Sequence, residues 1–225
     1  MRPRLLETMR AEDGRVALLD RHLARLGASA EAFGYPVRLG AVRQRIEAEM
    51  GEETQGLRLT VGPEGDVEVT VRPLGDDPFR TAWIDPEPFP EAGSAVCTYK
   101  TTDREAYRAR FERARRLGAD EAILVNDQDE VTEGTRTNVW AEVDGRLWTP
   151  PLASGGLGGV YRAHVLATRP EAGERVLTPD DLRAADALFL SNALRGWMPV
   201  GLVDPGVRDW GTGETLPRPS PSTPL

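Results

Sequence analysis

The sequence predicts an α+β fold, and three observations lead to this expectation. Apolar residues recur at helical spacing over 18–33 and again over 38–50. Apolar and polar residues alternate on both sides of a GPEGD turn, which predicts a β-hairpin over 56–74. Further strand patterns and glycine turns follow in the second half, so antiparallel hairpins dominate and a doubly wound parallel sheet is not expected. The chain of 225 residues is long enough for one large domain or two smaller ones with a substantial core.

Each element of the first half follows from a local pattern. The first helix is expected over 18–33, because Gly34 stops its run of leucine and alanine. The second helix is expected over about 38–50, before Gly51, and the hairpin comes next. The proline-rich stretch 85–94 has little hydrophobic pattern, so we expect a linker or a loop that crosses between domains.

The second half is expected to combine short strands with two helices. A short strand of β-branched and aromatic residues is expected to end near Lys100, and a helix over about 103–117 follows and stops at Gly118. A glycine-rich loop, SGGLGG, precedes another helix that begins near Gly159. From Asp204 the chain is rich in proline and glycine, and we expect its end to be a disordered tail. The remaining strands are expected in EAILVN, TNVWAEV, RLWTP and ADALFLSN.

The composition argues against several classes of function. The chain has 28 basic and 36 acidic side chains, a net charge of −8, which is unlike a general binder of nucleic acid or anionic membranes. Cys97 is the single cysteine, so no internal disulfide requires an oxidising compartment. The chain starts without an apolar signal core and contains no run of about 18 apolar residues that could span a bilayer. We therefore expect a cytoplasmic protein that binds neither nucleic acid nor membrane and has no metal site.

The basic residues are unusual in kind. Among the 28 basic side chains the only lysine is Lys100, and all the others are arginine. A GC-rich coding background explains an excess of arginine by itself, and the lysine is then a chance survivor. The alternative is that this position needs an amine, because arginine stays protonated whereas lysine can act as a nucleophile, a base or a Schiff-base partner. Composition alone does not decide between the two explanations.

Four local motifs together supply what a pyridoxal-phosphate site requires. Lys100, at the end of AVCTYK, offers the amine. Glu133, in VTEGTRTNVW, is either an ordinary turn acid or a carboxylate that keeps a pyridine nitrogen protonated. The glycine loop in GGLGGVYR opens a helix whose backbone amides suit a phosphate. Arg25 offers a cation one turn after His22 on the first helix, where His22 by itself is more often a structural histidine.

Six motifs follow one another from about Leu5 to Val200: LLETMR, DRHLARL, YKTTDREAY, DEAILVNDQDEVTEGTRTNVW, TPPLASGGLGGVYR and FLSNALRGWMPV. Their order resembles the class IV aminotransferase family, the fold-type IV pyridoxal-phosphate enzymes. The resemblance implies a two-domain architecture like that of D-amino-acid aminotransferase, with pyridoxal 5′-phosphate in the cleft between the domains. A smaller N-terminal α/β domain would cover 1–88, a larger cofactor-binding domain 89–203, and a tail 204–225. Family members are usually homodimers, so a homodimer is expected.

The resemblance also implies roles for single residues. Lys100 would form the Schiff base, Glu133 would pair with the pyridine nitrogen, and Arg25 would bind the cofactor phosphate. Either Tyr107 or Arg104 would lie near the ring hydroxyl. The phosphate would also meet the backbone amides of Val160 and Tyr161 and the turn at Asn192 and Ala193, and Asn138 and Thr135 would build the floor behind the ring.

Within the family, KTTDREAY and SNALRG are more similar to 4-amino-4-deoxychorismate lyase than to the branched-chain enzymes. The lyase converts an amino substrate to 4-aminobenzoate and pyruvate in folate biosynthesis, with Lys100 as the expected general base and Lys100 or Thr8 handling protons. The alternative is an aminotransferase of the branched-chain or D-amino-acid type, which transfers an amino group to a 2-keto acid. Three arginines are candidates for the substrate carboxylate: Arg10, Arg136 and Arg195.

Two departures from the family pattern favour a third possibility, a non-catalytic member whose phosphate site has decayed. Gly158 stands where the loop usually has proline, and Ala193 stands where serine or threonine often offers a hydroxyl to the phosphate. The loss of one hydrogen bond to a charged group lowers affinity roughly tenfold to a hundredfold. Lys100 and Glu133 weigh against this possibility, because an inactive member would have little reason to keep both.

Overall fold

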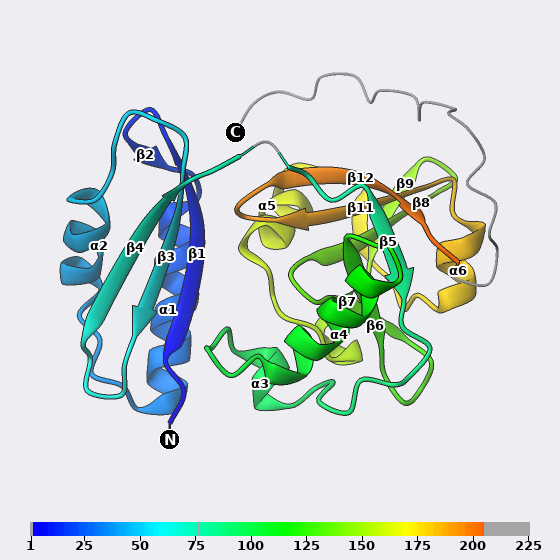
Figure 1. The fold of residues 1–225 in the computed structure, drawn as a ribbon, viewed down its shortest axis with the longest axis horizontal. Helices are drawn as coiled ribbons and strands as arrows, with labels where there is room; N and C mark the ends of the chain where they lie inside the picture. Colours follow the sequence, from blue (N-terminus) through cyan, green and yellow to red (C-terminus); the bar gives the residue numbers. More distant parts are fainter. Residues whose placement is uncertain (1, 76, 205–225) are drawn as a thin grey trace.

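The computed structural model describes residues 2–75 and 77–204, and within these ranges the chain is built on two separate sheets (Figure 1). The first sheet has four strands in the order β2-β1-β3-β4, with helices α1 and α2 packed on it. The second sheet has eight strands in the order β10-β9-β8-β11-β12-β5-β6-β7. The predicted α+β class is confirmed, because both sheets are joined mainly by antiparallel pairs. We call the first sheet with α1 and α2 the first unit, and the described chain from Thr81 onwards the second unit. The elements of the first unit are β1 (Leu5–Glu12), β2 (Arg15–Val16), α1 (Leu19–Phe33), α2 (Leu39–Glu47), β3 (Gln55–Val61) and β4 (Val67–Pro73).

The central strand β1 has two faces with different tasks. It pairs antiparallel with β3, from Leu5 opposite Val61 to Ala11 opposite Gln55. Successive side chains of a strand point to opposite faces, and Leu5, Met9 and Ala11 are buried in the core that α1 covers. Leu6 and Thr8 therefore point to the opposite face of the sheet, the one that α1 does not cover. This face is directed towards the second sheet.

The helices of the first unit agree with the sequence pattern at their starts and less well at their ends. Helix α1 ends at Gly34, whose φ of 65° lies in the left-handed region that glycine adopts without strain. Helix α2 ends at Glu47, three residues before the expected end, since only Val42 and Ile46 of this helix are buried. The predicted hairpin is present as β3 and β4.

The change from one sheet to the other occurs earlier in the chain than expected. Strand β5 (Thr81–Ile84) already pairs with β12 and β6 of the second sheet. The division therefore falls between Pro73 and Thr81, whereas the sequence pattern placed it between residues 88 and 89. The proline-rich stretch 85–94 stays within the second unit, where the backbone amide of Phe89 donates to the carbonyl of Val125.

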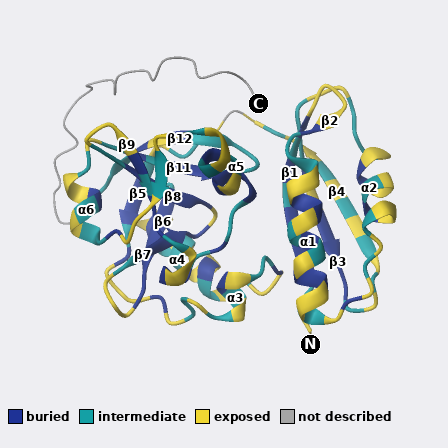
Figure 2. Cartoon of the chain, turned by 180° about the vertical axis from the view of Figure 1, so that it is seen from behind, coloured by how far each residue is buried: buried dark blue, intermediate teal, exposed yellow. Residues whose placement is uncertain are grey.

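The second sheet forms a core of its own. Its buried strand residues include Ile123, Val139 and Leu190, and Figure 2 shows these strands as largely buried. The remaining elements are α3 (Ala95–Thr98), α4 (Glu105–Arg116), β6 (Glu121–Val125), β7 (Val131–Gly134), β8 (Asn138–Val143), β9 (Arg146–Thr149), η1 (Leu152–Ser154), α5 (Val160–Thr168), β10 (Ala172–Glu174), α6 (Pro179–Ala184), β11 (Ala187–Asn192) and β12 (Gly196–Leu202).

The prediction of a short strand that ends near Lys100 is wrong. The residues that suggested it form the short helix α3, because the backbone amides of Cys97 and Thr98 both donate to the carbonyl of Ser94 and close a helical turn. Lys100 still meets a strand, since its carbonyl accepts from the amide of Leu6 at 2.9 Å. The following helix α4 agrees with the predicted helix over 103–117.

None of the helices in the described ranges is long and apolar enough to cross a lipid bilayer. The predicted tail, except for Asp204, lies outside the described residues.

Candidate active site

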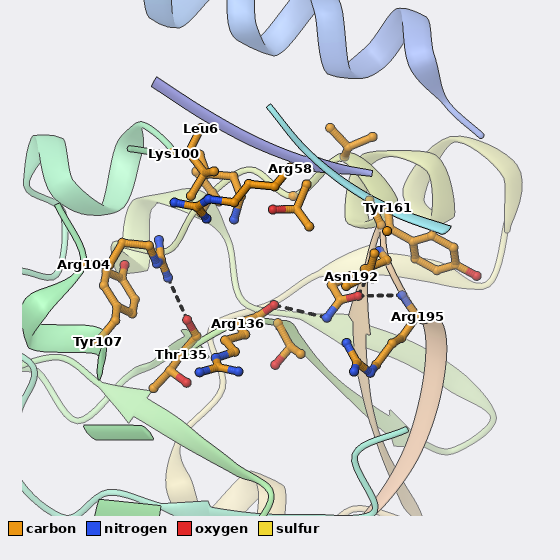
Figure 3. Close-up of a pocket in the computed structure, with 18 of the residues that line it drawn as sticks. Leu6, Arg58, Lys100, Arg104, Tyr107, Thr135, Arg136, Tyr161, Asn192 and Arg195 are labelled. Carbon is orange, nitrogen blue, oxygen red and sulfur yellow. Dashed lines mark hydrogen bonds between the residues drawn. The ribbon is translucent and has the colours of Figure 1, made fainter. Parts of the chain in front are cut away.

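A cleft of about 680 Å³ lies between the open face of the first sheet and the second unit (Figure 3). Leu6 and Thr8 of β1 contribute one wall, together with Arg58 of β3, which pairs directly with Thr8 across the sheet. Of the residues predicted for the site, the cleft lining includes Thr8, Arg25, Lys100, Arg104, Tyr107, Glu133, Thr135, Asn138, Val160, Tyr161, Asn192 and Ala193. The fold therefore brings all of these predicted residues to one place.

Lys100 occupies the junction between the two units. The contact of its backbone with β1 holds the side chain at the cleft wall, between α3 and α4. Removal of the amine from water, together with the nearby cations Arg104 and Arg25, lowers the pKa of Lys100 to about 7. An ordinary lysine has a pKa above 10, so here a large share of neutral amine is present near neutral pH. The neutral amine is the form that reacts as a nucleophile or accepts a proton.

Glu133 is a buried carboxylate with two hydrogen-bond donors. Its side chain is 4% exposed, and the hydroxyl of Tyr107 donates to its Oε1 at 2.6 Å. The backbone amide of Leu157 is a second donor. Burial raises the pKa of Glu133, and these donors together with Arg104 oppose that rise. Arg104 stacks on the ring of Tyr107 at 3.9 Å from its centroid and donates to the carbonyl of Thr135.

The glycine-rich loop forms a close cradle before α5. A Cβ on Gly159 would lie 1.8 Å from Oδ1 of Asn138, so only glycine fits there. Asn138 also donates from Nδ2 to the carbonyl of Leu157 at 2.9 Å, which ties the loop to β8. The first amides of a helix have no partner inside the helix, and those of Val160 and Tyr161 lie at the cleft. This geometry suits an anion such as a phosphate.

The turn between β11 and β12 forms the opposite side of this cradle. The Oδ1 atom of Asn192 accepts from the backbone amides of Leu194 and Arg195 at 3.0 and 2.8 Å. The side-chain amide of Asn192 donates to the carbonyl of Arg136 (Figure 3). Asn192 therefore shapes the turn, and Ala193 reaches the cleft without a hydroxyl.

Arg25 is positioned by a carboxylate that sequence reasoning missed. Its Nε and Nη2 donate to Glu7 at 2.8 and 2.6 Å, and its Nη1 donates to the carbonyl of Gly158 at 3.1 Å. Glu7 is 2% exposed and also contacts Nδ1 of His22 at 2.7 Å. Burial alone would raise the pKa of Glu7, but Arg25 and His22 outweigh it and lower that pKa to about 2. One signal in the sequence could have revealed this contact. Glu7 occupies an inward position of β1, on the face that α1 covers with His22 and Arg25.

Arginines dominate the charge of the cleft. Arg58 and Arg72 come from the first sheet and were not singled out in the sequence, where nothing separates them from the other arginines. Burial lowers the pKa of the Arg58 guanidinium, and the neighbouring cations Arg72 and Arg104 lower it further. Among the described residues, neither Arg58 nor Arg72 has a carboxylate partner. The cleft therefore presents unneutralised positive charge and suits an anionic ligand.

The three arginines expected for a substrate carboxylate have different surroundings. Arg10 pairs with Glu12 and does not line the cleft. Arg195 lines the cleft but pairs with Asp77 at 2.7 Å. Arg136 also lines the cleft, with its guanidinium 3.6 Å from the ring centroid of Phe111. Burial lowers the pKa of Arg136, the buried Glu121 opposes this shift, and the neighbouring Arg104 and Arg195 lower the pKa further.

A second buried carboxylate organises the loop that follows Glu133. Glu121 is fully buried and accepts from the amides of Thr135 and Arg136 at 3.1 and 3.0 Å, and from the hydroxyl of Thr137. A Cβ on Gly134 would lie 2.2 Å from Oγ1 of Thr137, so the loop closes tightly there. Sequence reasoning missed Glu121, which stands in a strand-like run without any sign of its partners. No group of three or more metal-binding side chains occurs in the part of the chain that the structure describes.

The residues of the cleft fit pyridoxal 5′-phosphate. The cradle at Gly159 offers free amides to a phosphate, Lys100 offers an amine that is partly neutral near neutral pH, and Glu133 offers a buried carboxylate for a ring nitrogen. These groups lie before α5, between α3 and α4, and on β7, so no single motif identified the site.

Comparison with known proteins leads to the same family. The model of amino-transferase class IV matches residues 4–203. A protein of Schizosaccharomyces pombe named "Putative aminodeoxychorismate lyase" is 31% identical over 195 residues, which are 81% of this chain and 83% of that protein. The D-alanine aminotransferase of Bacillus licheniformis is 28% identical over 221 residues, which are 88% of this chain and 78% of that enzyme.

A solved structure agrees in fold and sequence. The Mesorhizobium loti protein named "Putative amino-acid aminotransferase" is similar with a TM-score of 0.82 at 33% identity, and the match covers 90% of this chain and 100% of that one. The predicted two-domain architecture of the fold-type IV enzymes is thereby confirmed. The chain belongs to amino-transferase class IV, whose members are pyridoxal-phosphate-dependent lyases and aminotransferases.

Proposed function

We propose that this protein is a 4-amino-4-deoxychorismate lyase, which produces 4-aminobenzoate and pyruvate for folate biosynthesis. The observation that carries the proposal is the placement of arginines on two walls of the cleft. Arg58 and Arg72 lie on the first sheet, and Arg136 lies on the second unit. The proposed substrate has two carboxylates and one amine, so the two walls suit its ends while the amine meets Lys100. The likeness to the S. pombe protein over 83% of its length supports the same activity.

We assign the cofactor contacts on the same geometry. Arg25 and the amides of Val160 and Tyr161 would hold the phosphate, the turn at Asn192 would close that side, and Glu133 would face the pyridine nitrogen. Lys100 would bind the aldehyde carbon in the resting enzyme and would be free as an amine once the substrate is bound. When bound, the cofactor supplies an electron sink for the negative charge that develops on the substrate.

The protein groups then divide the proton transfers between them. The amine of Lys100 removes the proton from the substrate carbon that carries the amine, which its pKa of about 7 permits. The bond between the ring carbon and the enolpyruvyl oxygen breaks, and the ring becomes aromatic. The departing enolpyruvate takes one proton from Lys100 or Thr8 and becomes pyruvate. Thr8 lies opposite Arg58 on the neighbouring strand, so its hydroxyl is next to a proposed carboxylate contact.

Product analysis tests this proposal. The protein loaded with pyridoxal phosphate is incubated with 4-amino-4-deoxychorismate and no keto acid, and equal amounts of 4-aminobenzoate and pyruvate are expected. Lys100→Ala should abolish turnover. Thr8→Val should slow it without weakening cofactor binding, while Thr70→Val, on the same sheet but outside the cleft lining, is the matched control. Absence of both products from loaded protein would refute the lyase.

An aminotransferase is the second candidate. The likeness to the B. licheniformis enzyme and to the M. loti protein favours it, because both are named as aminotransferases. In that case the protein converts an amino donor only when a 2-keto acid is present, and the amino group appears on the keto acid. Amino-group transfer without lyase products would establish this alternative.

We further propose that the protein is a cytoplasmic homodimer. The family pattern in the sequence supports the dimer, and the acidic chain with a single buried cysteine supports the location. Sedimentation equilibrium should give a mass near twice the 24.7 kDa of one chain. A single-chain mass at micromolar concentration would contradict the dimer.

A further inference from the structure

Tyr107 is directed at Glu133. It lies on α4, is 2% exposed, and its hydroxyl donates to Oε1 of Glu133 at 2.6 Å. The Sγ atom of Cys97 lies 3.0 Å from the same phenol oxygen. Although the sequence resemblance implied a place near the cofactor's ring hydroxyl, the phenol oxygen is occupied by partners within the protein.

The ring of Tyr107 is fixed on both sides. Phe89 packs against it with 4.8 Å between centroids, and the guanidinium of Arg104 stacks over it, as Figure 3 shows. These contacts hold the ring with its hydroxyl towards Glu133. Burial raises the pKa of the Tyr107 phenol, and the Glu133 charge raises it further, so the phenol stays protonated and remains a donor at physiological pH.

We propose that Tyr107 is a positioning residue that fixes the Glu133 carboxylate and keeps it ionised for the pyridine nitrogen of the cofactor. This inference rests on the proposed function for that use of Glu133. A carboxylate forms a strong ion pair with a protonated pyridine only while it is charged and correctly aimed, and burial works against the charged form.

The groups that face Glu133 come from several elements. Tyr107 lies on α4 and Arg104 lies at the start of that helix. Cys97 lies on α3, and Lys100 lies in the segment between α3 and α4. The backbone amide of Leu157 comes from the glycine-rich loop. The hydroxyl of Tyr107 donates directly to the carboxylate at 2.6 Å and favours its charged form, and the positive charge of Arg104 acts in the same direction. The pKa of Cys97 is raised by burial, so its thiol is uncharged and does not compete.

The test removes one hydroxyl and keeps the ring. In Tyr107→Phe the contacts with Phe89 and Arg104 remain, and only the donor to Glu133 is lost. The matched control is Tyr35→Phe, which also removes a buried phenol, one that donates to the carbonyl of Pro3 outside the cleft lining. Carbon-13 NMR of the glutamate carboxylates in the full chain without added cofactor follows the titration of Glu133, and Glu133→Gln assigns the resonance. Removal of a donor to a charged group should raise the pKa of Glu133 by about one to two units in Tyr107→Phe and leave it unchanged in Tyr35→Phe.

Cofactor binding provides the second readout. The pH below which affinity for pyridoxal phosphate declines should rise by a similar amount in Tyr107→Phe. If Tyr107→Phe fails to fold, 3-fluorotyrosine at position 107 takes its place, since the more acidic phenol is a stronger donor and should lower the pKa of Glu133. Unchanged titration of Glu133 in these variants overturns the inference and leaves the proposed function standing. If the titration of Glu133 shifts but the protein binds no pyridoxal phosphate, the proposed function is overturned. The role of Glu133 as partner of the pyridine nitrogen is then overturned as well.

Discussion

At the residue scale, Lys100 combines a unique side chain with an unusual environment. The lowered pKa predicts how the stability of the cofactor-free protein depends on pH. The unfolded chain holds the Lys100 proton up to a pH of about 10, whereas the folded chain releases it near 7, so the unfolded state binds more protons between these values. The free energy of unfolding should therefore rise with pH from about 7 to about 10. Lys100→Met should flatten this rise in urea titrations at several pH values, and parallel curves for the two proteins would contradict the assignment.

Ala193 is a second residue whose chemistry is open to a direct test. It reaches the cleft without a hydroxyl, beside the turn that Asn192 shapes. Ala193→Ser should add one hydrogen bond to the cofactor phosphate and tighten binding of pyridoxal phosphate roughly tenfold or more. Fluorescence or absorbance titration measures this change, and Ala167→Ser, exposed on α5, is the control. Equal affinity in Ala193→Ser and the parent protein would show that the phosphate does not reach this turn.

At the scale of single elements, the entry to α5 depends on two adjacent glycines with different surroundings. A Cβ on Gly159 would meet Oδ1 of Asn138 at 1.8 Å, whereas a Cβ on Gly158 would meet Leu152 at an ordinary 3.6 Å. Gly159→Ala should therefore cost about 1–3 kcal/mol of stability and move the amides of Val160 and Tyr161 away from the phosphate. Gly158→Ala should leave both properties nearly unchanged. Thermal unfolding with and without the cofactor measures both effects, and equal behaviour of the two variants would refute the cradle.

The elements also show where periodicity misleads. The run AVCTYK is rich in residues that favour strands, yet its first four residues form α3, because the carbonyl of Ser94 accepts from the amides of Cys97 and Thr98. Only after this turn does the chain meet β1, through Lys100 and Thr101. Longer segments such as α1 and the β3–β4 hairpin agree with their patterns, since many residues there report the same period. Short segments lack that redundancy, and tertiary contacts decide them.

At the scale of the whole molecule, the charge of the cleft opposes the charge of the chain. The net charge is −8, but Arg58, Arg72, Arg104 and Arg136 gather around one cavity. This arrangement attracts an anionic substrate by a field that salt screens. We expect kcat/KM to fall as ionic strength rises from 0.02 to about 0.3 M.

Replacement of one cleft arginine tests the source of that field. Arg58→Gln should lower kcat/KM roughly tenfold and reduce its dependence on salt, since one charge-assisted contact is lost. Arg15→Gln removes an exposed arginine outside the cleft lining and should change neither property. Identical salt dependence in the parent and Arg58→Gln would place the substrate elsewhere.

The amino-acid sequence by itself determined the chemical inventory: one amine at Lys100, a glycine loop before a helix, and an order of motifs typical of one family. It determined most helices and strands as well, because local periodicity follows from which side chains must be buried. Only the tertiary structure decided which acids and arginines work together. Glu7 holds Arg25, Arg25 reaches the carbonyl of Gly158 across 133 positions, and Tyr107 meets Glu133 across 26. These partners lie on different elements, and their contacts depend on how the sheets pack, which no local pattern records.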